Sequence, residues 1–278
     1  MPLFQAVVLA VVQALTEFLP ISSTAHLYLF PWLFGWGDPG LTFTVAVHAG
    51  TLVAVLLYFL RTWLELGLAG IGLHYPRTAS ADEVRQNRRM MWYLVAGTLP
   101  AGLAGYFGEH YIETTFRSPY LMGAMLVVVG VLMWVVEKRS PLARGMYAVS
   151  FGDAMAVGAA QAVALLPGVS RSGITIIAGL WRGMTREAAA RFTFLLSTPI
   201  IAGAAVKKLL ELRHTPPNGD ALQALLVGFV VSALFGYLVI AFFLRYLQTR
   251  TLKIFIVYRI LFGIVILLLA FLQMGNAR

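Results

Sequence analysis

The chain has 278 residues, of which 59% are hydrophobic and only 12% are charged, whereas about a quarter of the residues of a soluble domain are charged. This composition excludes a soluble globular fold and predicts a polytopic membrane protein, because several apolar runs reach the ~20 residues that a helix needs to cross a bilayer. The absence of cysteine excludes disulfides, thiol catalysis and cysteine-ligated metals. The net charge of +9 arises in short loops between apolar runs, which indicates membrane topology rather than nucleic-acid binding.

The first apolar segments are too short to span. Residues 1–19 are interrupted by polar side chains, including Glu17, and end at Pro20. Residues 25–36 are apolar again but equally short. Two half-length helices joined by a polar turn predict a re-entrant helical hairpin over residues 2–36, since broken backbone at membrane depth survives only inside protein or beside water.

The rest of the chain contains six full-length apolar runs and a second short pair. The second pair, over residues 149–181, predicts another re-entrant hairpin with an apolar approach, a Pro-Gly break and a polar tip. Residues 61–89 are read as a long polar segment with a short amphipathic piece, and residues 108–119 as a short loop. The six predicted transmembrane helices are 41–60, 90–107, 120–136, 188–206, 222–244 and 254–273.

The basic residues test this layout. If the first hairpin enters from outside, the inside loops hold fourteen Lys and Arg residues and the outside segments five. This distribution fits the positive-inside rule and puts both termini outside. Three spans separate the hairpins, so the hairpins enter from opposite sides. Similar Gln-Ala and Pro/Ser spacings in both predict an inverted-topology repeat, residues 1–148 and 149–278, as in many transporter folds.

The first hairpin carries a candidate metal and catalytic site. Gln13 and Glu17 are one helical turn apart, and a carboxylate with an amide oxygen suits a hard cation such as Mg²⁺ or Ca²⁺. An alternative is that Glu17 forms a structural ion pair with an arginine of the other hairpin. Ser23 and His26 could act as a nucleophile or as an acid–base pair, and Ser22 and Thr24 add hydroxyls beside them.

The second hairpin carries a candidate anion site. Ser170, Arg171, Ser172 and Thr175 combine a bidentate guanidinium with hydroxyls at a helix N-terminus, which suits phosphate. We expect Arg171 and Glu17 to approach each other near the membrane midplane.

Three further polar residues have competing interpretations. His48 could line the cavity, although a structural histidine is the simpler interpretation. Asp153 is read as a charge at a helix N-terminus. Arg259, in the last span, either snorkels to the interface or pairs with an acid.

Two long motifs resemble the signatures of the bacterial undecaprenyl-diphosphate phosphatase family of the bacitracin-resistance type. The first is Gln-Ala-Leu-Thr-Glu-Phe-Leu-Pro-Ile-Ser-Ser-Thr-Ala-His over 13–26, and the second is Pro-Gly-Val-Ser-Arg-Ser-Gly-Ile-Thr over 167–175. The likeness covers nearly the whole chain. It implies that Gln13 and Glu17 match the pair associated with a divalent metal, although many members carry Glu where this chain has Gln13.

The resemblance implies hydrolysis of undecaprenyl diphosphate to undecaprenyl phosphate and inorganic phosphate, which recycles the lipid carrier for cell-wall synthesis. It also implies bacitracin resistance and a site that opens to the outer face of the bacterial cytoplasmic membrane. Expected partners are the polyprenyl diphosphate and membrane lipids, without nucleic acid, and a homodimer is allowed for. Attack by Ser23, by His26 or by water remains open, and the inverted repeat leaves a flippase of undecaprenyl phosphate as the alternative function. The implied catalytic residues are Glu17, Ser23, His26 and Arg171, and the implied substrate-binding residues are Ser22, Thr24, His48, Ser170, Ser172 and Thr175.

Overall fold

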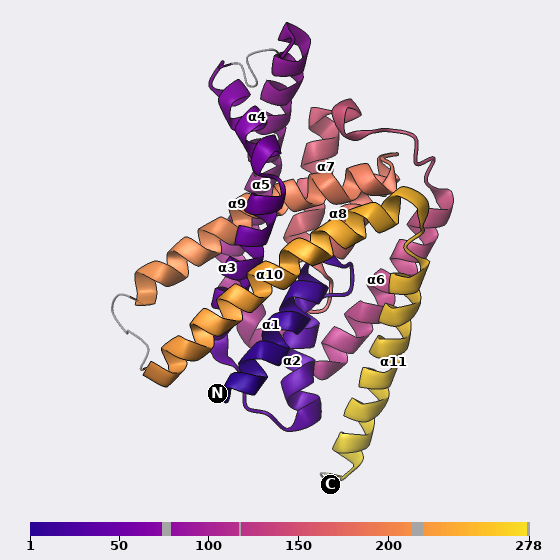
Figure 1. Cartoon of the computed structure of the whole chain (residues 1–278). Helices are drawn as coiled ribbons and strands as arrows, with labels where there is room; N and C mark the ends of the chain where they lie inside the picture. The colour runs from indigo at the N-terminus through magenta and orange to yellow at the C-terminus, as the bar shows by residue number, and fades with distance from the viewer. Residues whose placement is uncertain (74–78, 117, 213–218, 277–278) are drawn as a thin grey trace.

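The computed structural model describes residues 1–73, 79–116, 118–212 and 219–276, and this part of the chain is helical (Figure 1). It contains eleven α-helices, one 3₁₀ turn (Met146–Ala148) and no β-structure beyond one isolated bridge between Arg144 and Met184. The helices are α1 (Leu3–Phe18), α2 (Ser23–Phe34), α3 (Gly40–Tyr58), α4 (Leu60–Gly70), α5 (Ala81–Thr115), α6 (Pro119–Arg139), α7 (Phe151–Val163), α8 (Arg171–Trp181), α9 (Arg186–Leu212), α10 (Gly219–Thr249) and α11 (Lys253–Asn276).

Five of the described helices are long and apolar enough to cross a membrane, namely α3, α6, α9, α10 and α11. The chain is therefore a multi-pass membrane protein, as its composition predicts. The predicted span over residues 90–107 lies within α5, which is not one of the five.

The short amphipathic piece predicted within residues 61–89 corresponds to α4, but this segment is more helical than predicted, and the predicted loop 108–119 is wrong. Much of the polar segment 61–89 is helical, because α4 begins at Leu60 and α5 begins at Ala81. Ser80 and Glu83 form a capping box at the start of α5, which satisfies free backbone N–H groups there and lets a polar sequence remain helical. The predicted loop 108–119 is also mostly helix, since α5 continues to Thr115.

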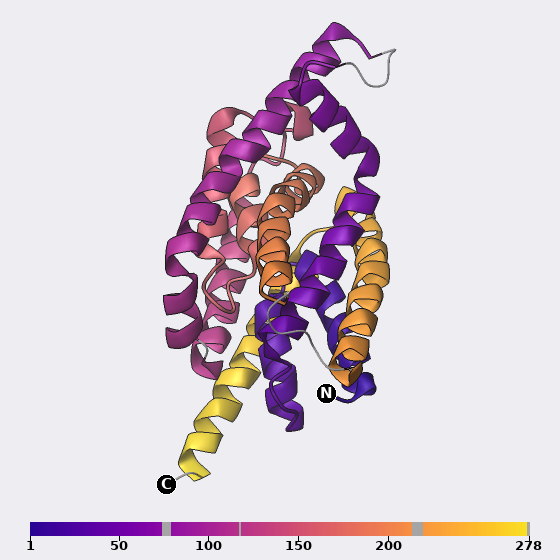
Figure 2. The same cartoon turned by 90° about the vertical axis from the view of Figure 1, so that its left-hand side faces the viewer.

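The short helices occupy opposite halves of the molecule. In Figures 1 and 2, both termini lie at one end, while α4 and the start of α5 project from the other end. The pair α1 and α2 lies toward the end with the termini, and α7 lies toward the opposite end. Helix α1 packs on α10, and α7 packs on α5. Helices α6 and α11 pack along each other, as do α3 and α10.

Close helix crossings depend on missing side chains at two glycines. A methyl group on Gly158 of α7 would overlap the carbonyl oxygen of Gly97 on α5. A methyl group on Gly50 of α3 would overlap Ser232 on α10. Small residues let helix backbones approach where lipid supplies no hydrophobic drive for association. These contacts fix α5 and α10 beside the short helices and α3.

Asp153 holds the loop end of α7, outside the five apolar spans. It forms a capping box with Ser150, and its carboxylate accepts hydrogen bonds from Arg144 Nη2 and Arg182 Nε, both at 2.7 Å. Burial alone would raise the pKa of Asp153, but the hydrogen bonds from Arg144, Ser150 and Arg182 lower this pKa well below its usual value. The prediction that Asp153 is a charge at a helix N-terminus is confirmed.

We expect Asp153→Asn to lower the free energy of unfolding of the purified protein at neutral pH by about 2 kcal/mol, because hydrogen bonds to a buried charge are lost. The melting temperature should fall accordingly. The pKa of Asp153 is lower in the folded state than in the unfolded state. Its carboxylate therefore contributes fully to the free energy of unfolding above the unfolded-state pKa of about 3.9, and this contribution is lost as the pH falls through the folded-state pKa. Asp82→Asn is the control, since Asp82 and its partner Arg85 are mostly exposed and such pairs contribute little. Equal melting temperatures for both variants would contradict the prediction.

Candidate active site

Glu17 is the centre of a buried charged cluster. It is 7% exposed, and its Oε2 accepts hydrogen bonds from Gln13 Nε2 at 3.1 Å and Ser23 Oγ at 2.6 Å. His48 Nε2 lies 3.5 Å from the same oxygen, and Arg171 Nη2 lies 3.7 Å from Oε1. The predicted approach of Arg171 to Glu17 is thereby confirmed, and one carboxylate gathers groups from both hairpins.

The turn after α1 gives the first half of this cluster its shape. Ser22 precedes α2 with φ 79°, an uncommon value for a residue other than glycine. Its Oγ accepts a hydrogen bond from the N–H of Ala25 at 3.4 Å and lies 3.2 Å from Thr24 Oγ1. Ser23 is the first residue of α2, so the turn directs it back toward Glu17 on the preceding helix.

The turn after α7 has the same construction. Ser170 precedes α8 with φ 72° and accepts a hydrogen bond from the N–H of Gly173 at 3.1 Å. Ser170 Oγ also lies 3.2 Å from Ser172 Oγ, and Thr175 Oγ1 donates to the carbonyl of Arg171 at 2.6 Å. Two helix N-termini, each capped by a strained serine, therefore lie beside the charged cluster. Such termini favour anions.

One hydrogen bond joins the two turns directly. Ser172 Oγ donates to the carbonyl oxygen of Leu19 at 3.0 Å, although the two residues are 153 positions apart. The candidate groups of the two hairpins thus form one site.

Ser23 and His26 each have hydrogen-bond partners other than one another. Ser23 donates to Glu17. His26 Nδ1 lies 2.7 Å from the carbonyl oxygen of Ser22, and Nε2 lies 2.6 Å from the hydroxyl of Tyr258. A carbonyl only accepts, so Nδ1 carries a proton, and in a neutral ring the Tyr258 hydroxyl is the donor to Nε2. His26 also stacks on Phe262, with ring centroids 4.8 Å apart.

His48 bonds to the backbone of its own helix and also faces Glu17 in the site. Its Nδ1 lies 2.8 Å from the carbonyl oxygen of Thr44, so this nitrogen carries a proton, and Nε2 is left facing Glu17. The purely structural interpretation of His48 is therefore incomplete.

Several buried polar atoms have no hydrogen-bond partner among the described residues. They include Gln13 Oε1 and Arg171 Nη1 in the site and both amide atoms of Gln161 on α7. Buried polar groups are rarely left unpaired, so each of these atoms requires a polar ligand, water or an ion. Gln161 is the residue of the second hairpin that the sequence pairs with Gln13, and it is 3% exposed.

The donor set fits a divalent cation that is shared with a phosphate. Gln13 Oε1 is an unpaired buried oxygen beside the Glu17 carboxylate. No group of three or more His, Cys, Asp or Glu side chains in the described part of the chain could hold a metal ion alone. Mg²⁺ commonly uses one or two carboxylates and completes its shell with water and substrate phosphates.

Two residues of α11 contact the site region without having been predicted as site residues. Tyr258 contacts His26, and the fully buried Arg259 donates to backbone carbonyls of both turns. Arg259 neither snorkels nor pairs with an acid, as no carboxylate of the described residues lies within ion-pair distance of it. Its charge inside an apolar run was the only signal in the sequence.

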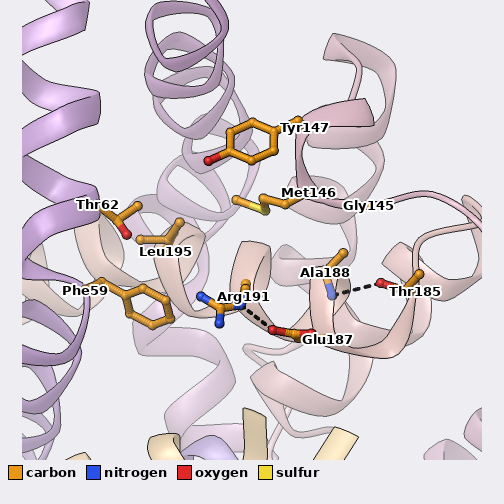
Figure 3. Close-up of a pocket in the computed structure, with 10 residues that line it drawn as sticks. All are labelled: Phe59, Thr62, Gly145, Met146, Tyr147, Thr185, Glu187, Ala188, Arg191 and Leu195. Atoms are coloured by element: carbon orange, nitrogen blue, oxygen red, sulfur yellow. Dashed lines mark hydrogen bonds and ion pairs between the residues drawn. The ribbon is translucent and has the colours of Figure 1, made fainter. Parts of the chain in front are cut away.

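Two cavities lie at opposite ends of the helix bundle. A cavity of about 140 Å³ adjoins the site, between Thr24 of α2, Pro167 of the second turn and Thr44 near the start of α3. A separate cavity of about 320 Å³ lies at the basic end, between Phe59, Tyr147 and the ion pair of Glu187 and Arg191 (Figure 3). None of the predicted site residues lines this second cavity.

The fold and the site define a class: a multi-pass membrane protein with a buried, charged site closed by two short helical hairpins. The chain belongs to the Bacitracin resistance protein BacA family, whose model matches residues 6–265. It is 46% identical over 270 residues to an undecaprenyl-diphosphatase of Pelotomaculum thermopropionicum, covering 97% of each chain. It is 47% identical to an undecaprenyl-diphosphatase of Geobacter metallireducens, covering 96% of this chain and 98% of the relative.

Proposed function

We propose that the chain hydrolyses undecaprenyl diphosphate to undecaprenyl phosphate and inorganic phosphate, which returns the lipid carrier to cell-wall synthesis and confers bacitracin resistance. The observation that carries this proposal is the opposition of Glu17 and Arg171 at 3.7 Å across the two hairpins. The names of the relatives and the family agree with this activity. An arginine and two helix N-termini can bind phosphate and stabilise charge that develops during phosphoryl transfer, and a buried acid can accept a proton.

Arg171 and the second turn would bind the diphosphate. The unpartnered Arg171 Nη1 is available to a phosphate oxygen, and Ser170 would contribute a hydroxyl at the N-terminus of α8. Ser172 and Thr175 already donate to the carbonyls of Leu19 and Arg171, so they would hold the turn in shape. Ser22 and Thr24 would do the same at the N-terminus of α2. Because these donors are held in place before substrate binds, they stabilise charge that develops on the transferred phosphoryl group.

Ser23 is the nucleophile that the geometry favours. Its hydroxyl already donates to Glu17 at 2.6 Å, whereas both ring nitrogens of His26 are occupied. Ser23 Oγ would attack the terminal phosphorus while its proton passes to Glu17. The anhydride P–O bond then breaks, and undecaprenyl phosphate leaves. A water molecule would next attack the phosphorus of the phosphoserine. The bond between Ser23 Oγ and phosphorus breaks, Glu17 returns the proton to Ser23, and inorganic phosphate is released. His26 would support the turn that carries Ser23.

Gln13 and Glu17 would hold a divalent cation, Mg²⁺ or Ca²⁺, through Gln13 Oε1 and the carboxylate. When bound, such an ion would neutralise part of the diphosphate charge.

We further propose six transmembrane crossings, with α5 as the sixth, and two re-entrant hairpins in an inverted repeat of residues 1–148 and 149–278. The matching serine turns at Ser22 and Ser170 support the repeat, as do the equivalent packings of α1 on α10 and of α7 on α5. In the bacterial cytoplasmic membrane, the excess of basic loops would place the projecting start of α5 inside. The cavity beside Thr24 and Thr44 would then open to the outer face.

Purified protein in detergent tests the proposed activity, because no membrane is present to cross. We expect release of inorganic phosphate from undecaprenyl diphosphate. If no inorganic phosphate were released and undecaprenyl phosphate moved across the membrane of reconstituted vesicles, the transporter alternative would be favoured over the enzyme.

Acid quenching during turnover of terminally ³²P-labelled substrate tests the nucleophile. We expect an acid-stable phosphoserine at Ser23, because phosphate esters of serine survive acid whereas phosphohistidine does not. Ser23→Ala should lower kcat by about 10³-fold and abolish the label. Label on His26 that survives only a parallel alkaline quench would favour attack by His26, and no label under either quench at full activity would favour attack by water.

A further inference from the structure

Arg259 is buried completely in the second turn of α11. A charged side chain inside an apolar helix is costly and calls for an explanation. Arg259 is outside the set of residues assigned to the proposed reaction, and its guanidinium has no carboxylate partner among the described residues. Its hydrogen bonds therefore have to account for its position.

Among the described residues, the guanidinium hydrogen-bonds only backbone carbonyls, and these come from three separate segments. Nη1 donates to Pro20 O in the first turn at 3.0 Å, and Nη2 donates to Gly168 O and Val169 O in the second turn, each at 3.0 Å. Weaker bonds reach the carbonyls of residues 125 and 126 on α6, at 3.4 and 3.3 Å. One side chain thus joins both turns to the same helix pair.

The carbonyls of Pro20, Gly168 and Val169 lie where the helices break. Helix α1 ends at Phe18 and α7 ends at Val163, so the turns that follow contain carbonyls outside any α-helix. Buried carbonyls need donors, and an apolar environment supplies none. Arginine is suited to this role because it has five N–H donors in a fixed planar arrangement, while lysine has three around one nitrogen.

We propose that Arg259 is a positioning residue that clasps the two hairpin turns together and so sets the distance between Glu17 and Arg171. The bonded residue Pro20 lies three positions after Glu17 and three before Ser23, and Val169 lies two positions before Arg171. The Ser172–Leu19 hydrogen bond is a second, weaker link between the turns. This inference rests on the proposed function only for its effect on activity.

Arg259→Lys tests the clasp, because it keeps the charge but cannot reach all three segments at once. Hydrogen–deuterium exchange of the detergent-solubilised protein should accelerate by about tenfold in both turns, residues 18–26 and 165–175, as hydrogen bonds there weaken. Exchange in residues 153–161 of α7 should not change. In detergent, kcat for undecaprenyl diphosphate should fall by about 10²-fold through misalignment, while KM should change less because the charge remains.

Phe255→Leu is the matched control. Phe255 lies one turn before Arg259 on α11 and packs against Phe243 and Tyr246 of α10. It should lower thermal stability without accelerating exchange in the turns or changing kcat.

Gly130→Ala is the second variant if Arg259→Lys does not fold, since it keeps the arginine. An added methyl group would lie 2.9 Å from Ile260 and 3.4 Å from Arg259 Cβ. We expect faster exchange in the same two turns, with a smaller loss of kcat.

Unchanged exchange in both turns overturns the clasp, whatever happens to activity. Faster exchange with normal kcat overturns the positioning role. Because exchange is measured without substrate, failure of the clasp and failure of the proposed function can be distinguished.

Discussion

Replacing Glu17 with Gln should nearly abolish phosphate release, with kcat falling by about 10³-fold. The glutamine has almost the same shape but no charge. It cannot take the proton of Ser23, whose hydroxyl lies 2.6 Å from Glu17 Oε2, and it is a poorer ligand for a cation. It also leaves Arg171 and His48 without their shared anion. The measurement is inorganic phosphate released from undecaprenyl diphosphate in detergent.

Glu65→Gln is the matched control for Glu17. Glu65 pairs with Arg61, which is largely exposed, and such an ion pair contributes little. We expect this variant to retain wild-type kcat and KM. If Glu17→Gln kept more than a tenth of the wild-type kcat while Glu65→Gln behaved normally, Glu17 would have no direct part in the reaction.

Replacing Arg171 with Lys should lower kcat/KM by about 10²- to 10³-fold, and replacing it with Ala should lower it further. Lysine keeps a positive charge near Glu17, so part of the attraction for diphosphate survives. It cannot reproduce the planar pair of N–H groups that Arg171 would direct at a phosphate under the proposed function. Kinetics in detergent should show a larger loss in kcat than in substrate binding, because the fixed donors act most strongly on the transition state.

Arg191→Lys makes the same chemical change elsewhere in the molecule. Arg191 pairs with Glu187 beside the separate cavity at the basic end of the bundle (Figure 3). We expect its kinetics to match those of the wild type. Equal losses in Arg171→Lys and Arg191→Lys would indicate a general effect of arginine replacement on folding, and would remove Arg171 from the site.

The losses of activity caused by replacing Glu17 and by replacing Arg171 should not be additive in free energy. Because the two side chains contact each other, removal of either one disturbs the environment of the other, and the double variant should lose less than the product of the single losses.

The sequence by itself determined the class of this protein and most of the candidate site. Apolar run lengths predicted a multi-pass helical membrane protein, because a helix needs a fixed number of residues to cross lipid. The paired breaks predicted the two short hairpins. Gln13 and Glu17, like Ser170 and Arg171, are close in the chain, so helix geometry and turn chemistry were enough to place each pair together.

Polarity alone did not predict how far the helices extend outside the predicted spans. The charged residues before Met90 suggested a polar segment with only a short amphipathic piece, but the capping box of Ser80 and Glu83 starts α5 among them. Polarity shows whether a segment meets water and does not show whether its backbone is helical.

Only the tertiary structure decided which partners the buried polar groups have. Ser23 pairs with Glu17 rather than with His26, because the turn around Ser22 directs it back toward α1. His26 instead meets Tyr258, which is 232 positions away. Arg259 reaches both turns because α11 packs along α6 beside them. Contacts over such separations follow from how whole helices pack, and no short stretch of sequence contains that information.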